Sequence, residues 1–217
     1  DAKERIYVHL YIGSQVEVSL GERKIRLAMQ TELPWDEMTT IQVETEEPTE
    51  FEMALRLPGW CEQYTLWINA EEQAAEWRDG YLYLRRCWQT GDRVQIRLAM
   101  PVVVVQANPR VREDIGKAAL MRGPIVYCLE EADNGKDLHR IRMRADVEYQ
   151  IEHCPDLLQG VTRIRAQGEI LLPWEEDSLY AGSYTARYEA KELTWIPYYA
   201  WANRETGEMR VFARVRP

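Results

Sequence analysis

The segment FEMALRLPGW, residues 51–60, decides the fold class of this chain. Every second position from 51 to 57 is a large apolar residue: Phe51, Met53, Leu55 and Leu57. This period-two pattern is typical of a β-strand that buries one face, and we expect Leu55 and Leu57 to fill that face. Pro58-Gly59 predicts the turn that ends the strand, because both residue types interrupt strands and favour turns.

The same alternation recurs along both halves of the 217-residue chain. In the first half, alternating apolar residues lie at 6–12, 16–20, 25–29, 41–43, 66–68, 82–84 and 94–98. In the second half, the expected strands are residues 102–106, 117–121, 125–129, 140–149, 161–166, 194–199 and 209–215. Asp79-Gly80 predicts a two-residue hairpin turn, because both of its positions require a positive φ. Long helical windows are absent, although residues 189–193 could form one turn.

Short strands at a spacing of roughly 8–12 residues predict an all-β fold. Residues 101–105 (PVVVV) do not alternate, so this segment is either buried on both faces or crosses between two packed bodies. We place a domain boundary there and expect two consecutive antiparallel β-sandwich domains, residues 1–103 and 104–217. A single larger two-sheet domain is the alternative.

Composition restricts the classes of partner. The chain has 36 acidic and 27 basic residues, which give a net charge of −9. This balance argues against nucleic acid, because affinity for nucleic acid comes mainly from neutralising phosphates. No stretch reaches the roughly 18 apolar residues of a membrane helix, so we expect no membrane partner.

The cysteines and the N-terminus bear on the cellular compartment. Cys61, Cys87, Cys128 and Cys154 form no CxxC motif and no Cys-His pair at metal-ligand spacing, so we expect free, buried thiols. Disulfides or a reactive thiol are the alternatives. Reduced cysteines, together with the absence of Asn-x-Ser/Thr sequons, favour a cytoplasmic location. Residues 1–5 lack the apolar core of a signal peptide, although a mature secreted protein would look the same.

Residues that could perform chemistry are dispersed. The three histidines are isolated, and the sequence contains no GxSxG, glycine-rich phosphate-loop or HExxH motif. The acidic clusters at 44–47 and 175–177 are expected to form solvated rims, since sequence neighbours on one loop rarely face each other across a sugar. We therefore expect no catalytic, cofactor-binding or metal-ligating residue. The eight Trp and twelve Tyr could stack on sugars, or pack in the core instead.

Six ordered motifs together carry a family resemblance. They lie at residues 54–60 (ALRLPGW), 88–94 (WQTGDRV), 99–102 (AMPV), 107–109 (ANP), 116–134 (beginning GKAALMRGPIVYCLE) and 196–209 (beginning IPYYAWANR). In this order and spacing they resemble the C-terminal region of the β-L-arabinofuranosidase family, glycoside hydrolase family 127, also known as domain of unknown function 1680. The resemblance extends over nearly the whole chain.

The resemblance implies a division of labour. Members of this family resemble an (α/α)6 catalytic barrel followed by two β-sandwich domains, with a zinc ion and a nucleophilic cysteine in the barrel. A Cys-Cys pair precedes the first sandwich strand in the family. This chain has no such pair, and none of its cysteines matches a catalytic position. The resemblance therefore implies a chain without the barrel, without its own cofactor and without enzymatic activity.

Three functions follow as hypotheses. The first is a non-catalytic accessory region that braces the catalytic barrel of its parent protein, with homodimerisation as a further expectation. The second is a carbohydrate-binding module that uses exposed Trp or Tyr side chains to bind an arabinose-containing saccharide. The third is a protein-interaction module that docks a separate catalytic chain.

One group of side chains is the candidate interface or packing cluster. Tyr198, Tyr199, Trp201 and Asn203 combine aromatic and polar character within six residues. They could pack inside the second sandwich or contact a neighbour, and the sequence leaves both readings open.

Overall fold

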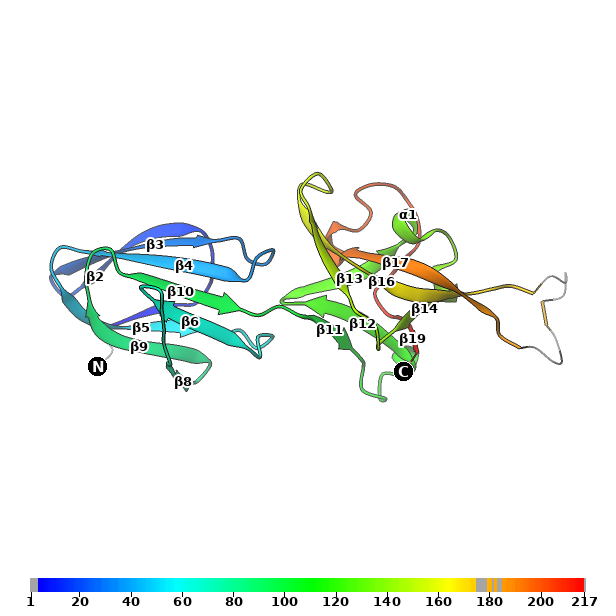
Figure 1. Ribbon diagram of the computed structural model, residues 1–217, viewed down its shortest axis with the longest axis horizontal. Coiled ribbons are helices and arrows are strands. Elements are labelled where there is room, and N and C mark those ends of the chain that lie inside the picture. The colour runs from blue at the N-terminus through cyan, green and yellow to red at the C-terminus, as the bar shows by residue number, and fades with distance from the viewer. Residues whose placement is uncertain (1–3, 175–178, 181, 183–184, 217) are drawn as a thin grey trace. The chain divides into compact units, whose positions relative to one another are not determined.

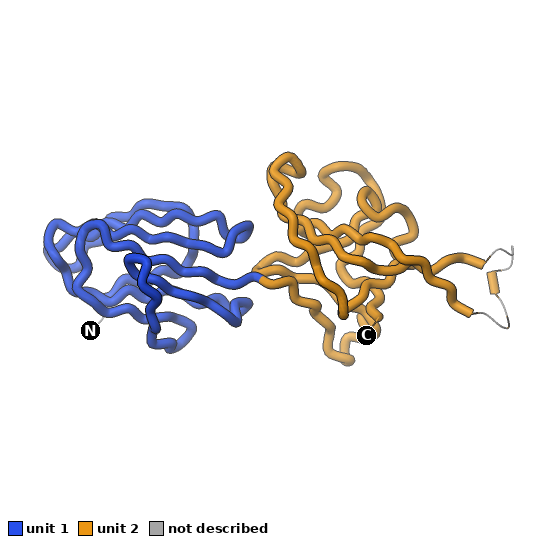
Figure 2. The backbone as a smooth tube through the Cα atoms, in the orientation of Figure 1, with its two compact units in different colours: residues 1–100 blue, residues 101–217 orange. Residues whose placement is uncertain are grey.

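The computed structural model describes residues 4–174, 179–180, 182 and 185–216. The chain forms two compact units, residues 1–100 and 101–217 (Figures 1 and 2). Among the described residues, both units consist of β-strands with a few short helical turns. No helix in the described part of the chain is long and apolar enough to cross a membrane.

The described part of the first unit contains ten strands in two sheets. The strands are β1 (Arg5–Val8), β2 (Ser14–Leu20), β3 (Arg23–Thr31), β4 (Met38–Thr45), β5 (Thr49–Arg56), β6 (Tyr64–Ile68), β7 (Glu71–Glu72), β8 (Glu76–Arg78), β9 (Tyr81–Trp88) and β10 (Arg93–Leu98). One sheet has the order β1-β5-β9-β8, and the other has the order β2-β3-β4-β10-β6-β7. Both sheets contribute to one apolar core.

Residues of the FEMALRLPGW segment lie in this core as the alternation predicts. Phe51, Met53 and Leu55 of β5 are buried, and Leu57 packs against them from beyond the strand end. The Phe51 ring stacks on Trp88 at 5.5 Å between ring centroids. The indole N–H of Trp88 donates to the Phe51 carbonyl oxygen at 3.0 Å, so the buried polar atom is satisfied.

The first strand differs from the sequence prediction. The alternation from Ile6 to Ile12 predicts one strand with a buried face, but β1 ends at Val8, and Leu10 and Ile12 are 61% and 60% exposed. In addition, β1 pairs parallel with β5, so the four-stranded sheet is mixed. The prediction of an antiparallel sandwich is therefore wrong for this unit, because alternation reports a buried face and not the direction of the neighbouring strand.

Nine strands lie in the described residues of the second unit. They are β11 (Val102–Val105), β12 (Lys117–Arg122), β13 (Ile125–Glu130), β14 (Ile141–Arg144), β15 (Gln150–Cys154), β16 (Val161–Leu171), β17 (Tyr188–Pro197), β18 (Met209–Arg210) and β19 (Ala213–Arg216). The short helices are η2 (Arg112–Asp114), α1 (Glu131–Asn134), η3 (Leu138–Arg140) and η4 (Tyr198–Ala200).

Six of these strands close into a barrel. The pairing runs β12-β19-β14-β16-β17-β13, and β13 pairs with β12 again. β14 and β19 pair parallel, and the barrel interior holds a separate apolar core that includes Tyr127 and Trp195. The predicted second sandwich is therefore wrong, because β19 pairs with both β12 and β14 and lets the sheet close on itself.

Of the two local turns predicted from the sequence, one is confirmed and one is wrong. The hairpin at Asp79-Gly80 is confirmed, since it joins β8 to β9 with φ values of +51° and +81°. The helical turn at 189–193 is wrong, because these residues lie in β17 and pair with β16. The close approach of β16 and β17 uses Gly168, where a Cβ atom would lie 2.3 Å from Leu193 Cδ1.

Candidate functional site: an exposed aromatic loop

The aromatic cluster singled out in the sequence lies at the surface. Residues 198–204, here called the aromatic loop, comprise η4 and the turn that follows it. Tyr198, Tyr199 and Trp201 are 45%, 59% and 40% exposed. Asn203 helps to fold the loop, because its side-chain amide donates to the carbonyl oxygens of Ala200 at 3.0 Å and Trp201 at 3.3 Å.

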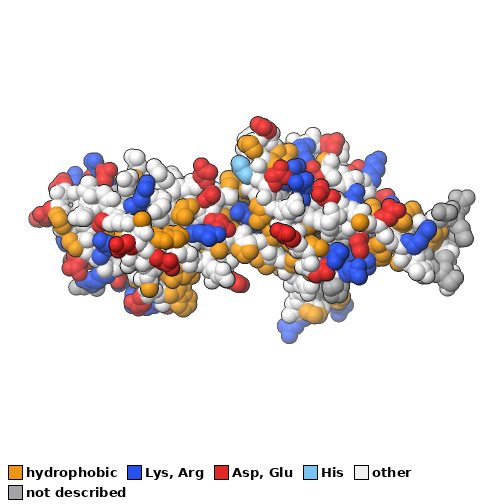
Figure 3. All heavy atoms as spheres, viewed as in Figure 1, with side chains coloured by type: hydrophobic (Ala, Val, Ile, Leu, Met, Phe, Trp, Pro, Cys, Tyr) orange, Lys and Arg blue, Asp and Glu red, His pale blue; other side chains and the backbone are white. Residues whose placement is uncertain are grey.

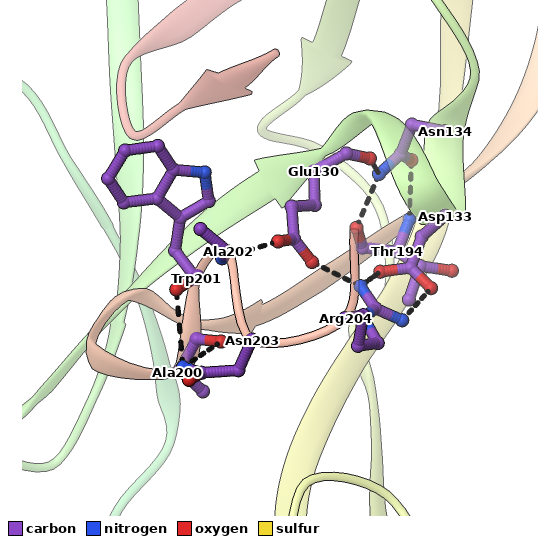
Figure 4. Close-up of polar contacts among 9 residues, drawn as sticks. All are labelled: Glu130, Asp133, Asn134, Thr194, Ala200, Trp201, Ala202, Asn203 and Arg204. Atoms are coloured by element: carbon purple, nitrogen blue, oxygen red, sulfur yellow. Dashed lines mark hydrogen bonds and ion pairs between the residues drawn. The ribbon is translucent and has the colours of Figure 1, made fainter. Parts of the chain in front are cut away.

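A buried carboxylate holds the aromatic loop to the barrel. Glu130, at the end of β13, is only 3% exposed. One oxygen of its carboxylate accepts the backbone N–H of Ala202 at 2.8 Å. The other oxygen pairs with the Arg204 guanidinium, which also donates to Asp133 of α1 at 2.9 Å (Figure 4). We call Glu130, Asp133 and Arg204 the ionic brace.

Asn134, which is almost completely buried, fixes the backbone beside the ionic brace. The Asn134 side chain accepts the Thr194 N–H at 3.0 Å and donates to the Thr194 carbonyl oxygen at 2.8 Å. It also donates to the Glu130 carbonyl oxygen at 3.0 Å. Asn134 thus ties α1 to β17, the strand that leads into the aromatic loop.

The ionic brace shifts the pKa of Arg204. Hydrogen bonding to Asp133, together with Glu130, raises the pKa of Arg204 against the opposing effect of its partial burial. Arg204 is therefore a permanent cation between two carboxylates. Buried ion pairs gain little net stability but fix geometry, since removing one partner leaves an uncompensated charge. The loop also contains Ala202 at φ +62°, a conformation that costs a residue other than glycine about 1–2 kcal/mol.

The cysteines divide into two classes. All four are free, as the sequence predicts, but only Cys61 and Cys128 are buried; Cys87 is exposed and Cys154 is half-buried. Burial raises the pKa of Cys128 to about 12, which disfavours the reactive thiolate form.

The acidic cluster at 44–47 lies at the surface. Glu44, Glu46 and Glu47 are exposed, and the cluster at 175–177 lies outside the described residues. A shallow depression of about 300 Å³ on the six-stranded sheet is lined by Glu17, Arg26 and Glu44. Arg26 pairs with Glu17 at 3.0 Å and holds the pKa of that carboxyl group below its usual value. A glycosidase general acid needs the opposite shift.

One group of metal-ligating side chains was not anticipated from the sequence. Ligand atoms of Asp137, His139 and Glu208 lie within 4.8 Å of one another, and all three residues are exposed. The carboxylates already have partners: Asp137 pairs with Arg140 at 3.3 Å, and Glu208 accepts the Leu138 N–H at 2.8 Å. Glu208 lies about 70 residues further along the chain, so sequence spacing could not reveal this group.

Charged side chains of both signs are mixed on the face of each unit that Figure 3 draws, without an extended basic area among the residues described. Many basic side chains in the described part of the chain are paired with carboxylates, as Arg142 is with Glu169. Affinity for nucleic acid would require such cations to face phosphates.

Comparison with known proteins matches both units to one family. The model of the GH127 β-L-arabinofuranosidase middle domain matches residues 5–100, and that of the glycoside hydrolase family 127 C-terminal domain matches residues 102–214. A non-reducing end β-L-arabinofuranosidase from Bifidobacterium longum subsp. longum is 35% identical over 99% of this chain and 33% of its own length.

Solved structures of the same family resemble this chain over nearly its whole length. The GH127 β-L-arabinofuranosidase Ara127N from Geobacillus stearothermophilus T6 is 39% identical, with a TM-score of 0.94 over 100% of this chain and 34% of that chain. A second GH127 β-arabinofuranosidase is 31% identical, with a TM-score of 0.86 over 98% of this chain and 35% of that one. The chain thus spans about a third of the length of these relatives, and it belongs to glycoside hydrolase family 127.

Proposed function

We propose that this chain is the non-catalytic accessory region of a β-L-arabinofuranosidase-like glycoside hydrolase, and that it braces the catalytic portion of that enzyme. The observation that carries this proposal is the extent of the match. The chain corresponds to the middle and C-terminal domains of the family, while the relatives are about three times as long.

The electrostatics of the described residues support a non-catalytic role. Hydrolysis of a glycoside needs two facing carboxyl groups, one of which has a raised pKa so that it can act as an acid. Each described carboxyl group with a shifted pKa is shifted downward by neighbouring cations: Glu17, Asp146 and Glu169. Such groups are suited to surface ion pairs and not to proton donation at neutral pH.

The zinc centre that the family resemblance implies does not fit this chain. The four cysteines are divided between the two units, with two in each, and all are free. The metal-ligating group found among the described residues contains one histidine, two carboxylates and no cysteine.

The first unit presents a surface suited to a bracing role. Tyr7, Leu10, Ile12 and Val16 are large apolar side chains that are exposed within ten residues of sequence. The first unit matches the middle domain of the family, so in its relatives this domain lies between other parts of the enzyme. We infer that these four residues, here called the apolar strip, pack against that catalytic portion.

Hydrolysis by the purified chain tests the absence of activity. With an aryl β-L-arabinofuranoside as substrate, we expect no turnover above the buffer blank, with or without added zinc. Turnover that disappears on substitution of a single carboxylate or cysteine would overturn the proposal.

Association in trans tests the bracing role. The catalytic portion of the Geobacillus relative, added as a separate polypeptide, should bind this chain in a sedimentation or biosensor assay. The double substitution L10S/I12S should weaken that binding at least tenfold, whereas Ile115→Ser, at an exposed aliphatic residue of the second unit, should not. Equal binding by both variants would contradict the role of the apolar strip.

A further inference from the structure

We propose that the aromatic loop binds a neutral, arabinose-containing oligosaccharide, with the rings of Tyr198, Tyr199 and Trp201 stacking against sugar faces. This inference goes beyond the bracing role, because it concerns the second unit and requires no catalytic portion. Its failure would leave the accessory function intact.

The first step of the argument is preorganisation. An exposed loop normally loses conformational entropy on binding, which weakens its affinity for a ligand. Here the ionic brace and the bond from Ala202 N–H to Glu130 fix the loop before any ligand arrives. Figure 4 shows the Trp201 ring directed away from the ionic brace, so the brace positions the ring without covering it.

The second step concerns the polar atoms of the rings. The Trp201 indole N–H and the Tyr198 hydroxyl have no side-chain hydrogen-bond partner within the described part of the chain. Aromatic side chains with one apolar face and one polar edge suit ligands that present both C–H and O–H groups. A sugar ring has this combination on adjacent surfaces, so Tyr198 and Trp201 each offer it a stacking face and one polar group.

The third step is the size of the surface. A whole aromatic side chain has roughly 150–250 Å² of surface. The exposed fractions of Tyr198, Tyr199 and Trp201 therefore amount to about 200–350 Å². A stable protein–protein interface requires about 800 Å² from each partner. The aromatic loop is thus too small to hold a second copy of this chain by itself, but it is large enough for two or three sugar rings.

The fourth step is charge. The chain carries a net charge of −9, and Glu205 and Glu208 follow the aromatic loop as exposed carboxylates. Acidic saccharides such as uronates would be repelled at low ionic strength. The electrostatic environment therefore favours a neutral saccharide over an anionic one.

Calorimetric titration of the whole 217-residue chain with a β-L-arabinofuranosyl oligosaccharide tests the proposal. We expect saturable binding to the wild-type chain and at least a tenfold loss of affinity for Trp201→Ala. The matched control is Trp77→Ala, which removes a tryptophan that is 62% exposed on β8 of the first unit and should leave affinity unchanged. An oligogalacturonide of equal length should bind at least tenfold more weakly than the neutral probe.

Three results would overturn the proposal. The first is no heat of binding from the wild-type chain at millimolar probe. The second is undiminished binding by the Trp201→Ala variant, or an equal loss in the Trp77→Ala control. The third is concentration-dependent self-association in light scattering that Trp201→Ala abolishes, which would identify the aromatic loop as an interface between copies of the chain. Because Trp201 is a surface residue, its replacement should not prevent folding.

Discussion

Removal of Arg204 should release the aromatic loop from the barrel. Arg204→Ala leaves Glu130 and Asp133 close together without their shared cation, and Glu130 is 3% exposed. Loss of one partner of a buried ion pair costs about 3–5 kcal/mol. Because the Arg204 side chain retains 22% exposure, we take the lower limit, about 3 kcal/mol. The loss should be local to the aromatic loop and α1, since none of the three residues of the ionic brace belongs to the apolar core of the barrel.

Native-state hydrogen exchange measures this effect at one atom. The Ala202 amide is protected by its bond to the Glu130 carboxylate. A loss of about 3 kcal/mol corresponds to roughly 100-fold faster exchange of that amide. Arg214→Ala is the control: Arg214 is an exposed arginine of β19, and its replacement should change exchange in the aromatic loop less than threefold. A change below threefold for Arg204→Ala would refute the idea that the ionic brace orders the aromatic loop.

Three further predictions concern packing, thiol reactivity and pH. Gly168→Ala should lower stability by about 1–3 kcal/mol, because the new methyl group overlaps a leucine of β17; an unchanged melting temperature would contradict this close approach. A thiol reagent should label Cys87 rapidly in the native chain and Cys128 only after unfolding, since Cys128 is buried with a pKa of about 12. Hydrogen bonding from Arg142 lowers the pKa of Glu169 in the folded chain. This carboxylate should therefore stabilise the fold above its unfolded pKa of about 4.3, and the stabilisation should disappear as the pH falls through the lower folded pKa. The Glu169→Gln variant should consequently show a shallower loss of stability in acid.

The sequence predicted local structure well where local physics decides it. The Asp79-Gly80 turn depends only on two adjacent φ angles, and the buried face of β5 depends only on side chains two residues apart. Leu10 and Ile12 fit the same alternation, yet they are exposed beyond the end of β1. Alternation describes which residues share a face, but whether another element covers that face depends on the rest of the fold.

The sequence pattern could not predict which strands pair with each other. A sandwich and a closed barrel both require strands with one apolar face, so alternation cannot distinguish them. The barrel closes because β12 pairs with both β13 and β19, and β19 is about 95 residues further along the chain. The parallel pairing of β1 with β5 similarly joins residues 47 positions apart. Such choices are made by the packing of the whole core and not by any local signal.

The aromatic loop illustrates the same limit at the candidate site. Its aromatic residues were recognisable as a cluster because they are adjacent in sequence. The ionic brace that holds the loop was not recognisable, since Glu130 lies 74 residues before Arg204 and resembles any glutamate at the end of a strand. Two acidic residues three positions apart near a predicted turn, Glu130 and Asp133, were the available signal, and they are equally typical of a solvated surface.

The two exposed apolar surfaces differ in chemistry, and this difference argues for two kinds of partner. Each unit has its own buried core, so neither surface is needed to complete a fold. The apolar strip of the first unit is mainly aliphatic, and aliphatic side chains gain free energy only when water is excluded over a broad, permanent contact. The aromatic loop is small, its large exposed side chains are aromatic, and the ionic brace holds it in place, which suits a ligand that binds and leaves. We infer that the first surface serves the architecture of the parent enzyme and the second serves its contact with saccharide.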